Sequence, residues 1–409
     1  MRRHESNMAS FEPYQTGAKL YREGTHRTDA PVHTVARIKP FMAAMGITRI
    51  ANLTGLDRLG IPVVGVFRPN SRSVAVAQGK GLNLDAAKAS GLMEAVETFH
   101  AETTGVQWFG GLEALRDQAV VDVRRLPRSS NAGLPHDELI PWVRGKNWRT
   151  GAPVWVPYEL VSTDYTLPLL SGTGHFNANT NGLASGNCAL EAVLHGLCEL
   201  IERDATALWW RRSPKAKAAR ALDLNSIGDR ACRWVLERYA DADIKVAVWD
   251  TTTDVGVASF LCGVYGRDPP LPEFGAGCHP SRDIALLRAL TEAAQARTTF
   301  IAGSRDDIGR KSYTSDFGAA RLGIFCALMD GIDVAVSFRD VPTNEFDTIG
   351  EDLEHVVTRL ETVGMNEIVV VDLTKQEFGI PVVRVVVPGL EGLVEDNYVP
   401  GARARSREA

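Results

Sequence analysis

Residues 191–203 read Glu191-Ala-Val-Leu-His-Gly-Leu-Cys-Glu199-Leu-Ile-Glu202-Arg203, a stretch in which acidic residues recur among aliphatic ones. Residues three and four apart share one face of an α-helix. We therefore expect a helix that presents carboxylates along one edge and packs with the other. Apolar flanks of this kind are typical of a helix inside a protein rather than on its surface.

Two further stretches repeat this pattern. They are Ser90-Gly-Leu-Met-Glu94-Ala-Val-Glu97 and Arg288-Ala-Leu-Thr-Glu292-Ala-Ala-Gln295, where an amide replaces the second acid. Glycine-rich or polar turns precede all three expected helices, at 79–81, 177–187 and 275–280. The repetition predicts partial internal duplication of a strand, turn and helix unit.

The acidic residues of the first two helices indicate a metal site. Five glutamates share this setting: Glu94, Glu97, Glu191, Glu199 and Glu202. Brought together without a cation, they would repel one another, and their pKa values would rise. Mg²⁺ relieves this repulsion and completes its coordination with water and phosphate oxygens. The alternative is a set of exposed, salt-bridged helix faces, but the apolar flanks of all three stretches favour the metal site.

A bound nucleotide also needs cations and hydrogen-bond donors. The cationic candidates are Lys19, Arg22, Arg27, Arg203 and Arg288. Asn187 and Gln295 can bind a base, a ribose or metal-bound water, although each residue alone also fits a surface or capping role. The sequence has no GxxxxGK[ST] motif, which excludes a P-loop protein, and 79–81 is too short for a phosphate loop.

Histidines and cysteines give weaker signals. His195 lies four residues from both Glu191 and Glu199, so it either orients a carboxylate or is a structural histidine. His279 fits either a cap or an active-site group. Six cysteines form no CxxC pair, which argues against a zinc or redox site. We expect Cys188 and Cys198 to be buried thiols.

The composition excludes several classes of protein. Of 409 residues, 44% are hydrophobic and 23% are charged, as in ordinary globular proteins, and the net charge is −5. An acidic chain is poorly suited to nucleic acid or anionic membranes. No apolar run approaches the roughly 20 residues of a membrane span, and residues 1–5 do not begin a signal peptide. We therefore expect a cytoplasmic protein that binds neither nucleic acid nor membrane.

The order of expected elements indicates an α/β fold with mixed sheets and packed helices. We expect strands at 48–54, 62–69, 73–81, 154–157, 245–249, 257–262, 367–371 and 382–387. We also expect helices at 223–240 and 350–363, and Asp85 as the N-cap of the first acidic helix. Without a clear linker, we divide the chain into an N-terminal segment (1–48) that contributes to the nucleotide site, a core (49–403) and a tail (404–409).

Taken together, these features make the sequence resemble the YcaO family. The resemblance is carried by the acidic stretches, by Thr180-Asn-Gly-Leu-Ala-Ser-Gly-Asn187, by Gly24-Thr25-His26-Arg27 with Lys19 before it, and by Pro388-Gly-Leu-Glu391. It spans residues 19 to 403, nearly the whole chain. It implies a YcaO-type fold with internal pseudo-symmetry around an ATP site. The implied cofactors are ATP and Mg²⁺.

The resemblance also implies an activity and roles for individual residues. YcaO proteins use ATP to phosphorylate a backbone amide oxygen, after which a nucleophile attacks the amide carbon and phosphate leaves. It places Glu94, Glu97, Glu191, Glu199 and Glu202 around the metal and triphosphate, and we assign catalysis to Glu94, Glu202 and Arg203. The residues that it implies for nucleotide binding or site organisation are Lys19, Arg27, Ser90, Asn187, Arg203, Arg288, Glu292 and Gln295.

One departure from the family pattern bears on the product. Azoline-forming members tend to end in PxPxP, whereas this chain ends Val399-Pro-Gly-Ala-Arg403-Ala-Arg405-Ser-Arg-Glu-Ala409. This favours the thioamide-forming branch, whose members work on a precursor peptide or protein with a TfuA-like sulfur-delivery partner. The family also implies a homodimer. The alternatives are an azoline-forming cyclodehydratase and, in another class, a non-catalytic nucleotide-binding accessory subunit.

Overall fold

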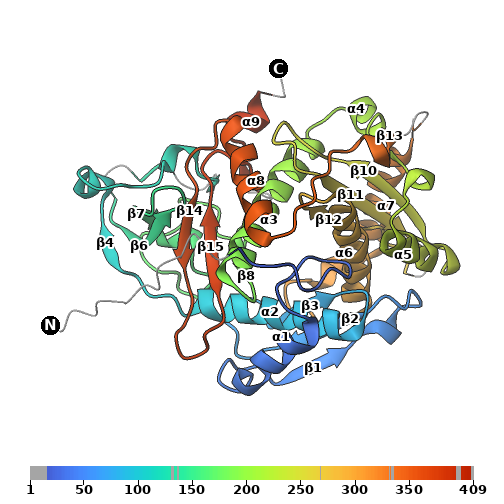
Figure 1. Cartoon of the computed structure of the whole chain (residues 1–409), viewed down its shortest axis with the longest axis horizontal. Helices are drawn as coiled ribbons and strands as arrows, with labels where there is room; N and C mark the ends of the chain where they lie inside the picture. The colour runs from blue at the N-terminus through green and yellow to red at the C-terminus, as the bar shows by residue number, and fades with distance from the viewer. Residues whose placement is uncertain are drawn as a thin grey trace.

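The computed structural model describes residues 16–129, 133–135, 138–267, 269–330, 332, 336–392 and 398–406. Residues 1–15 of the N-terminal segment and 407–409 of the tail lie outside the described residues. The molecule is built around three sheets with helices between and around them (Figure 1). This arrangement confirms the α/β fold of several sheets with packed helices, and the strands within these three sheets pair antiparallel.

The first two sheets have the same construction. The first contains the antiparallel strands β1 (Arg49–Asn52), β2 (Val63–Phe67) and β3 (Val76–Lys80), and helix α2 (Leu84–Glu102) follows. The second contains β10 (Lys245–Asp250), β11 (Ser259–Tyr265) and β12 (Glu273–Cys278), and helix α6 (Arg282–Ala302) follows. The predicted duplication of a strand, turn and helix unit is therefore present.

Glycines allow both helices to lie directly on their sheets. A Cβ atom on Gly79 of β3 would come 2.0 Å from the carbonyl oxygen of Ala87 in α2. A Cβ atom on Gly277 of β12 would come 2.1 Å from the carbonyl oxygen of Ala285 in α6. Only glycine permits so close an approach of two backbones. These glycines therefore let each helix pack directly against the strand that precedes it.

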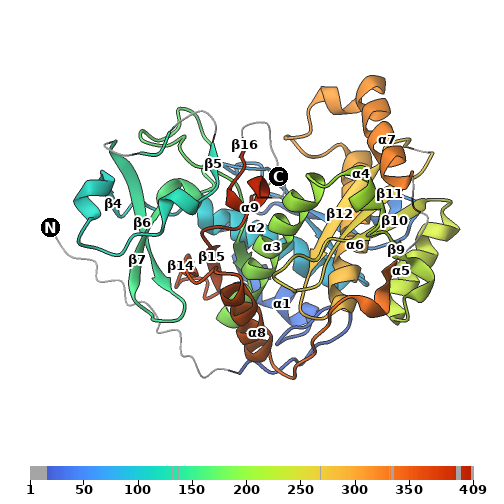
Figure 2. The same ribbon diagram turned by 90° about the horizontal axis from the view of Figure 1, so that it is seen from above.

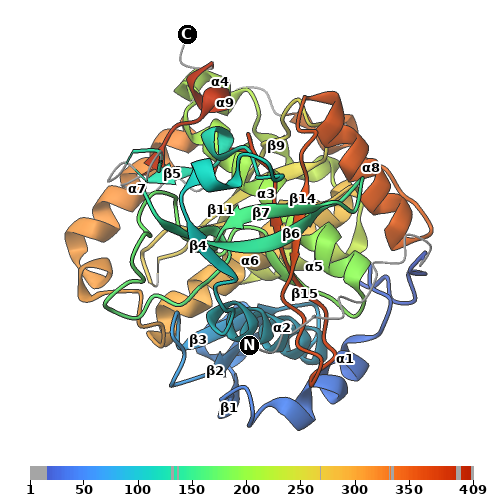
Figure 3. The same ribbon diagram turned by 90° about the vertical axis from the view of Figure 1, so that its left-hand side faces the viewer.

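The third sheet lies on the other side of the molecule. Its strands are β4 (Trp108–Gly110), β6 (Ile140–Asn147), β14 (Val369–Asp372), β15 (Val382–Val386) and β8 (Leu183–Ser185), in that order, with β7 (Pro153–Pro157) paired to β6. Figure 3 shows β6 and β7 at the front, with α2 and the first sheet beneath them. Helices α3 (Ala189–Trp210) and α8 (Ile349–Thr362) pack with β14 and β15 through buried aliphatic residues.

The remaining elements are short or peripheral. The helices are α1 (Pro31–Ile38), α4 (Pro214–Ala218), α5 (Arg230–Asp241), α7 (Ser315–Met329) and α9 (Ala402–Arg405). The strands are β5 (Arg128–Ser129), β9 (Leu222–Asp223), β13 (Val336–Ser337) and β16 (Tyr398–Val399). Within the described ranges, none of the helices has the length and apolar character needed to cross a membrane.

Several local predictions are corrected. Asn83, not Asp85, is the N-cap of α2, because its side chain accepts a hydrogen bond from the Ala86 N–H at 2.9 Å. The helix expected at 223–240 begins only at Arg230, after its N-cap Asp229. No helix was predicted within residues 1–48, but residues 31–38 form α1, which begins with Pro31, a favoured first residue of a helix.

Candidate active site

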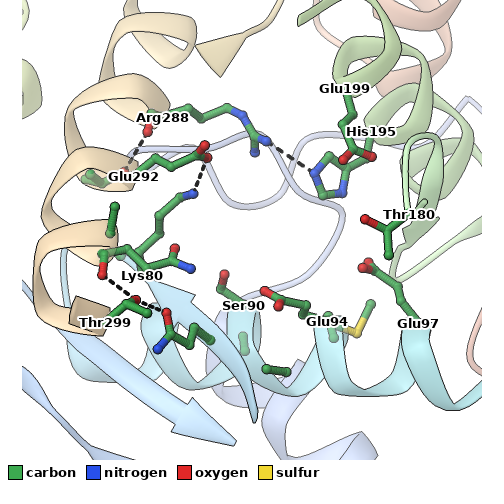
Figure 4. Close-up of a pocket in the computed structure, with 18 of the residues that line it drawn as sticks. Lys80, Ser90, Glu94, Glu97, Thr180, His195, Glu199, Arg288, Glu292 and Thr299 are labelled. Carbon is green, nitrogen blue, oxygen red and sulfur yellow. Dashed lines mark hydrogen bonds and ion pairs between the residues drawn. The ribbon is translucent and has the colours of Figure 1, made fainter. Parts of the chain in front are cut away.

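A cavity of about 720 Å³ lies where α2, α3 and α6 converge on β3 (Figure 4). Its lining includes most of the site residues predicted from the sequence: Arg27, Ser90, Glu94, Glu97, Asn187, Glu191, Glu199, Glu202, Arg203, Arg288, Glu292 and Gln295. Lys19 is absent from it. Three helices that are far apart in the chain thus contribute to one site.

Acidic residues form one wall of the cavity. Glu94 and Glu97 extend from α2, and Glu199 extends from α3 above them (Figure 4). The Glu97 carboxylate accepts hydrogen bonds from the Ser185 N–H at 2.8 Å and the Ser185 hydroxyl at 2.7 Å. Glu199 accepts one from the Gly182 N–H at 3.0 Å. These backbone contacts fix the direction of the carboxylates and leave other lone pairs facing the cavity.

Several buried glutamates of the cavity have raised pKa values, because nearby cations do not offset the effect of burial. Burial raises the pKa of Glu94 to about 7, against an opposing effect of Arg305. Burial, together with the neighbouring Glu94 and Glu199, raises the pKa of Glu97 to about 8 despite the Ser185 hydrogen bonds. Burial also raises the pKa of Glu202 to about 7. Such carboxylates gain most from a cation placed between them.

Glu202 and Arg203 lie next to each other on α3. The Glu202 residue is only 3% exposed, and its Oε2 atom has no hydrogen-bond partner. The Arg203 guanidinium is 3.6 Å from a carboxylate oxygen of Glu202 and 3.6 Å from one of Glu199. An unsatisfied buried carboxylate oxygen is costly, so the Glu202 side chain is suited to a ligand that enters the cavity.

The opposite wall, built on β3 and α6, already carries its own cations. The Lys80 Nζ atom lies 2.6 Å from the Glu292 carboxylate. Burial opposes ionisation of Glu292, but Lys80, Arg203 and Arg288 outweigh it and lower the pKa of Glu292 to about 2. Glu292 is therefore a permanent anion in an ion pair, unlike the carboxylates of α2.

His195 of α3 meets the cationic wall from across the cavity. Its Nε2 atom lies 3.3 Å from the Arg288 guanidinium (Figure 4). Burial, together with Arg288, Arg27 and Lys80, holds the pKa of His195 well below its usual range. The imidazole is therefore neutral and accepts the hydrogen bond from Arg288. The two sequence interpretations of His195 both missed this contact, because Arg288 is distant in the chain.

Glu191 differs from the other four predicted metal ligands. One of its oxygens accepts hydrogen bonds from the N–H of Thr28 and, at 2.7 Å, from its hydroxyl. The other accepts one from the Asn187 N–H at 2.8 Å. The Asn187 amide oxygen in turn accepts a hydrogen bond from the Thr34 hydroxyl at 2.8 Å. Glu191 therefore joins the N-terminal segment to α3, and its oxygens are less available to a metal than those of Glu94 or Glu202.

Lys19 lies away from the cavity lining, which corrects its assignment to nucleotide binding. Its Nζ atom is 2.6 Å from Asp352 of α8 and donates a hydrogen bond to the Phe346 carbonyl oxygen at 2.8 Å. The sequence showed that this cation needs an anionic partner, but it did not distinguish a phosphate from an aspartate 333 positions later, at 352. The distance along the chain is the physical reason for the error.

Among the cavity residues that were not assigned from the sequence, two cations stand out, Lys80 and Arg305. Lys80 was considered only as part of a glycine turn, and its position at the end of β3, just before an acidic helix, was the available signal. Arg305 also lines the cavity and forms an ion pair with Asp307. No local pattern marked Arg305, because it lies in a loop after α6.

His279 and the cysteines show no catalytic arrangement. The His279 Nδ1 atom accepts a hydrogen bond from the Ser281 N–H at 3.0 Å, just before α6, which fits the capping interpretation. Cys198 is buried as expected, whereas Cys188 is half-buried. Burial raises the pKa of Cys278, beside Cys198, well above its usual range, which disfavours the thiolate.

The residues of the cavity suit a magnesium–nucleotide complex. Carboxylate oxygens on α2 and α3 are the ligands that Mg²⁺ prefers. Lys80, Arg27, Arg203 and Arg288 are cations of the kind that suits phosphate oxygens. The orphaned Oε2 atom of Glu202 and the raised pKa values of Glu94 and Glu97 fit a donor set that a cation would complete.

Comparison with known proteins agrees with this geometry. The family model described as "YcaO cyclodehydratase, ATP-ad Mg2+-binding" matches residues 78–391. A protein in the tfuA 3′ region of Rhizobium leguminosarum bv. trifolii is 38% identical over 397 residues, which cover 92% of both chains. The chain therefore belongs to the YcaO family, whose cofactors are ATP and Mg²⁺.

Solved structures show the same fold. A YcaO protein from Methanopyrus kandleri, bound with AMPPCP and Mg²⁺, aligns with a TM-score of 0.74 at 23% identity, over 92% of this chain and 95% of that one. A heterocyclase in complex with substrate and cofactor aligns with a TM-score of 0.75 at 24% identity. The alignment covers 92% of this chain but only 54% of the heterocyclase, so the chain spans about half of that protein.

Proposed function

We propose that this YcaO-family chain uses ATP and Mg²⁺ to activate a backbone amide of a peptide or protein, and that the product is a thioamide. The observation that carries the proposal is the pairing of two unlike walls in one cavity. The buried carboxylates of α2 and α3 have too few cations beside them to balance their negative charge. Opposite them, β3 and α6 present Lys80 and Arg288. A metal-bound polyphosphate meets the needs of both walls.

Each wall has a distinct task in this proposal. Glu94, Glu97, Glu199 and Glu202 hold Mg²⁺, while Arg27, Arg203, Arg288 and Lys80 bind and orient phosphate oxygens. When bound, Mg·ATP supplies the phosphoryl group that converts the amide oxygen into a leaving group, which departs as phosphate when sulfide adds to the amide carbon. Because an amide oxygen is a weak nucleophile, the decisive contribution of the protein is to position it in line with that group.

The mouth of the cavity supports a peptide as the substrate. Ser73 and Val74, between β2 and β3, line the cavity together with Tyr165, Ile308 and Phe317. The Tyr165 N–H donates a hydrogen bond to the Arg72 carbonyl oxygen at 3.0 Å, and the Ala75 N–H donates one to Asp306 at 3.3 Å. Helix α7, which carries Phe317, lies outside the second sheet (Figure 2).

Charged groups at this mouth are paired within the protein. Arg321 lies 3.2 Å from Glu273, and Arg305 forms an ion pair with Asp307. Leu167 and Leu169, which follow Tyr165 in the chain, are 85% and 54% exposed. A peptide segment can contact such exposed apolar side chains while its backbone amide enters the cavity.

One observation favours sulfide as the nucleophile: the relative at 38% identity lies in a tfuA 3′ region. We therefore propose a TfuA-like protein as the partner that delivers sulfur.

The test is a reconstitution with the purified chain, ATP, Mg²⁺, sulfide and candidate precursor peptides encoded near its gene. We expect a mass increase that matches oxygen-to-sulfur exchange, located to one backbone amide by tandem mass spectrometry, and absent with Glu94→Gln. Loss of water would instead assign azoline formation. Nucleotide binding without ATP consumption, with peptide and partner present, would identify an accessory subunit and contradict the proposal.

A further inference from the structure

A buried cluster behind the cavity contains Lys19, His26, His279 and Asp352. The side chains of Lys19 and Asp352 are 0% and 1% exposed, and their charged atoms lie 2.6 Å apart. The His26 Nδ1 atom is 3.9 Å from the same Asp352 carboxylate, and the two histidine rings meet edge to face at a centroid distance of 5.4 Å. None of these groups has a part in the proposed amide chemistry.

The cluster anchors the segment that delivers Arg27 to the cavity. We call residues 16–28 the strap. At its start, the Gly17 carbonyl oxygen accepts a hydrogen bond from the Ile349 N–H of α8 at 2.8 Å. Toward its end, Tyr21 and Arg27 exchange two backbone hydrogen bonds of 3.0 Å, which close residues 21–27 into a loop. Lys19, before this loop, and His26, within it, therefore both lie against Asp352 of α8.

The residues that follow His26 are the ones that reach the site. Arg27 lines the cavity, and Thr28 donates to the Glu191 carboxylate through its N–H and its hydroxyl. Gly24, at φ +72°, turns the loop against Leu82 and Leu287, where a Cβ atom would come within 2.6 Å and 3.0 Å of their side chains. The position of Arg27 is therefore set by the contacts of Lys19 and His26 on one side and of Glu191 on the other.

A bound metal is the rival explanation for this cluster, because two histidines and an aspartate are a common ligand set. Two contacts speak against it. The Lys19 ammonium already lies at the Asp352 carboxylate. The His279 Nδ1 atom accepts the Ser281 N–H, so the proton of its neutral ring is on Nε2, which cannot then bind a metal.

We propose that Lys19, through its ion pair with Asp352, is a positioning residue that holds Arg27 of the strap in the nucleotide cavity. In this proposal the Gly24-Thr25-His26-Arg27 motif has a structural role: His26 faces Asp352 of α8, and Arg27 faces the nucleotide cavity. The inference rests on the proposed function only in that a nucleotide occupies the cavity.

The test measures binding of AMPPCP with Mg²⁺ to the full chain by calorimetry. Lys19→Met alone leaves a buried unpaired carboxylate and endangers folding, so the main variant is Lys19→Met/Asp352→Asn, which removes both charges. We expect its dissociation constant to rise roughly tenfold, with a cooperative thermal transition retained. Arg22→Ala is the matched control on the same strap. Arg22 was a cationic candidate in the sequence, but it is absent from the cavity lining and forms a longer, 3.4 Å pair with the exposed Asp347. The dissociation constant of this variant should equal that of the wild type.

A double-mutant cycle separates positioning from general stability. If Lys19 acts through Arg27, the double variant should have little further effect when Arg27→Ala is already present, whereas independent effects would add. Additive effects, or unchanged affinity of the double variant, would overturn the inference. Stoichiometric zinc that is lost in His26→Ala would also overturn it, in favour of a metal site. Failure of the wild type to bind AMPPCP would instead refute the proposed function.

Discussion

The β1–β3/α2 unit and the β10–β12/α6 unit share one construction but have opposite electrostatics. In both, an antiparallel three-stranded sheet leads into a helix that lies against strand glycines and presents a glutamate to the cavity. The pKa of Glu94 on α2 is raised to about 7, chiefly by burial, whereas Lys80, Arg203 and Arg288 overcome burial and lower that of Glu292 on α6 to about 2.

The difference arises because the cation of one unit serves the other. Lys80 is at the end of β3 in the first unit, yet its ammonium pairs with Glu292 of the second. The Lys80 cation of the first unit therefore neutralises Glu292 of the second unit instead of a carboxylate on α2. In the proposed function, one half of the duplicated scaffold holds the metal and the other presents positive charge to phosphate.

The largest expected effect follows from removing charge on the metal-requiring half. Glu94→Gln should lower ATP turnover by at least roughly 100-fold, because a positioned group that stabilises transition-state charge contributes about that much. Steady-state phosphate release measures it. Asp85→Asn on the same helix is the control, since Asp85 is exposed and pairs only with Lys88 at 3.4 Å. Equal activities of the two variants would show that the α2 unit does not hold the metal.

Removing the shared cation should make the two halves alike. Lys80→Met leaves Glu292 without its closest cation, so the pKa of Glu292 should rise and the cavity should become more negative. We expect the KM for ATP to increase about tenfold, and the Mg²⁺ concentration needed for half-maximal activity to increase with it. Lys88→Met, on the outer face of α2, should change neither value. A lowered KM for ATP in Lys80→Met would contradict this account.

The metal-free protein should lose stability as the pH rises from 6 to 9. The native pKa values of Glu94, Glu97 and Glu202, raised to about 7, about 8 and about 7, lie above the ordinary value of 4.5. The native state therefore keeps protons that the unfolded state has already released, and this stabilisation disappears through the native pKa values. Glu292 does not contribute to this pH dependence of stability. Its pKa of about 2 lies far below this range, so its protonation affects stability only in acid.

Differential scanning fluorimetry across this range, with and without Mg²⁺ and AMPPCP, checks the pH prediction. We expect the thermal midpoint to fall by several degrees in the metal-free protein and to stay nearly level with the ligand present. The Glu94→Gln/Glu97→Gln variant should lose most of the slope. A midpoint that rises with pH in the metal-free protein would reverse the assigned pKa shifts.

The smallest effect is expected from making the second unit's sequence match the first. Gln295→Glu restores on α6 the spacing of Glu94 and Glu97, and it adds a negative charge where phosphate is proposed to bind. We expect a threefold or smaller rise in the KM for ATP, roughly 0.6 kcal/mol, with kcat nearly unchanged. Gain of a second metal equivalent in this variant would show instead that the two halves are interchangeable.

Local pattern was enough to predict part of this molecule. The spacing of acids along 191–203 and its two partial repeats correctly located three helices, because helical periodicity is a local property. The glycine turns before the helices were also recognisable. The same reasoning missed α1 and α7, since α7 is apolar on most sides and has no clear polar face.

Pairings between distant residues were not predictable. A cation in a sequence does not show which anion, if any, lies near it in the fold. Lys19 was therefore assigned to phosphate although it pairs with Asp352, and Lys80 was passed over although it pairs with Glu292. Glu191 carried the same acidic signature as Glu199, yet its oxygens bind Thr28 and Asn187.

The most direct test of the account is the location of a metal bound together with nucleotide. Crystals of the full chain grown with AMPPCP and Mn²⁺, in place of Mg²⁺, would show the metal by its anomalous scattering. We expect the peak between α2 and α3, within coordination distance of carboxylates from Glu94 or Glu97 and from Glu199 or Glu202. A peak outside the cavity, or nucleotide bound there with no metal near either helix, would contradict the central claim.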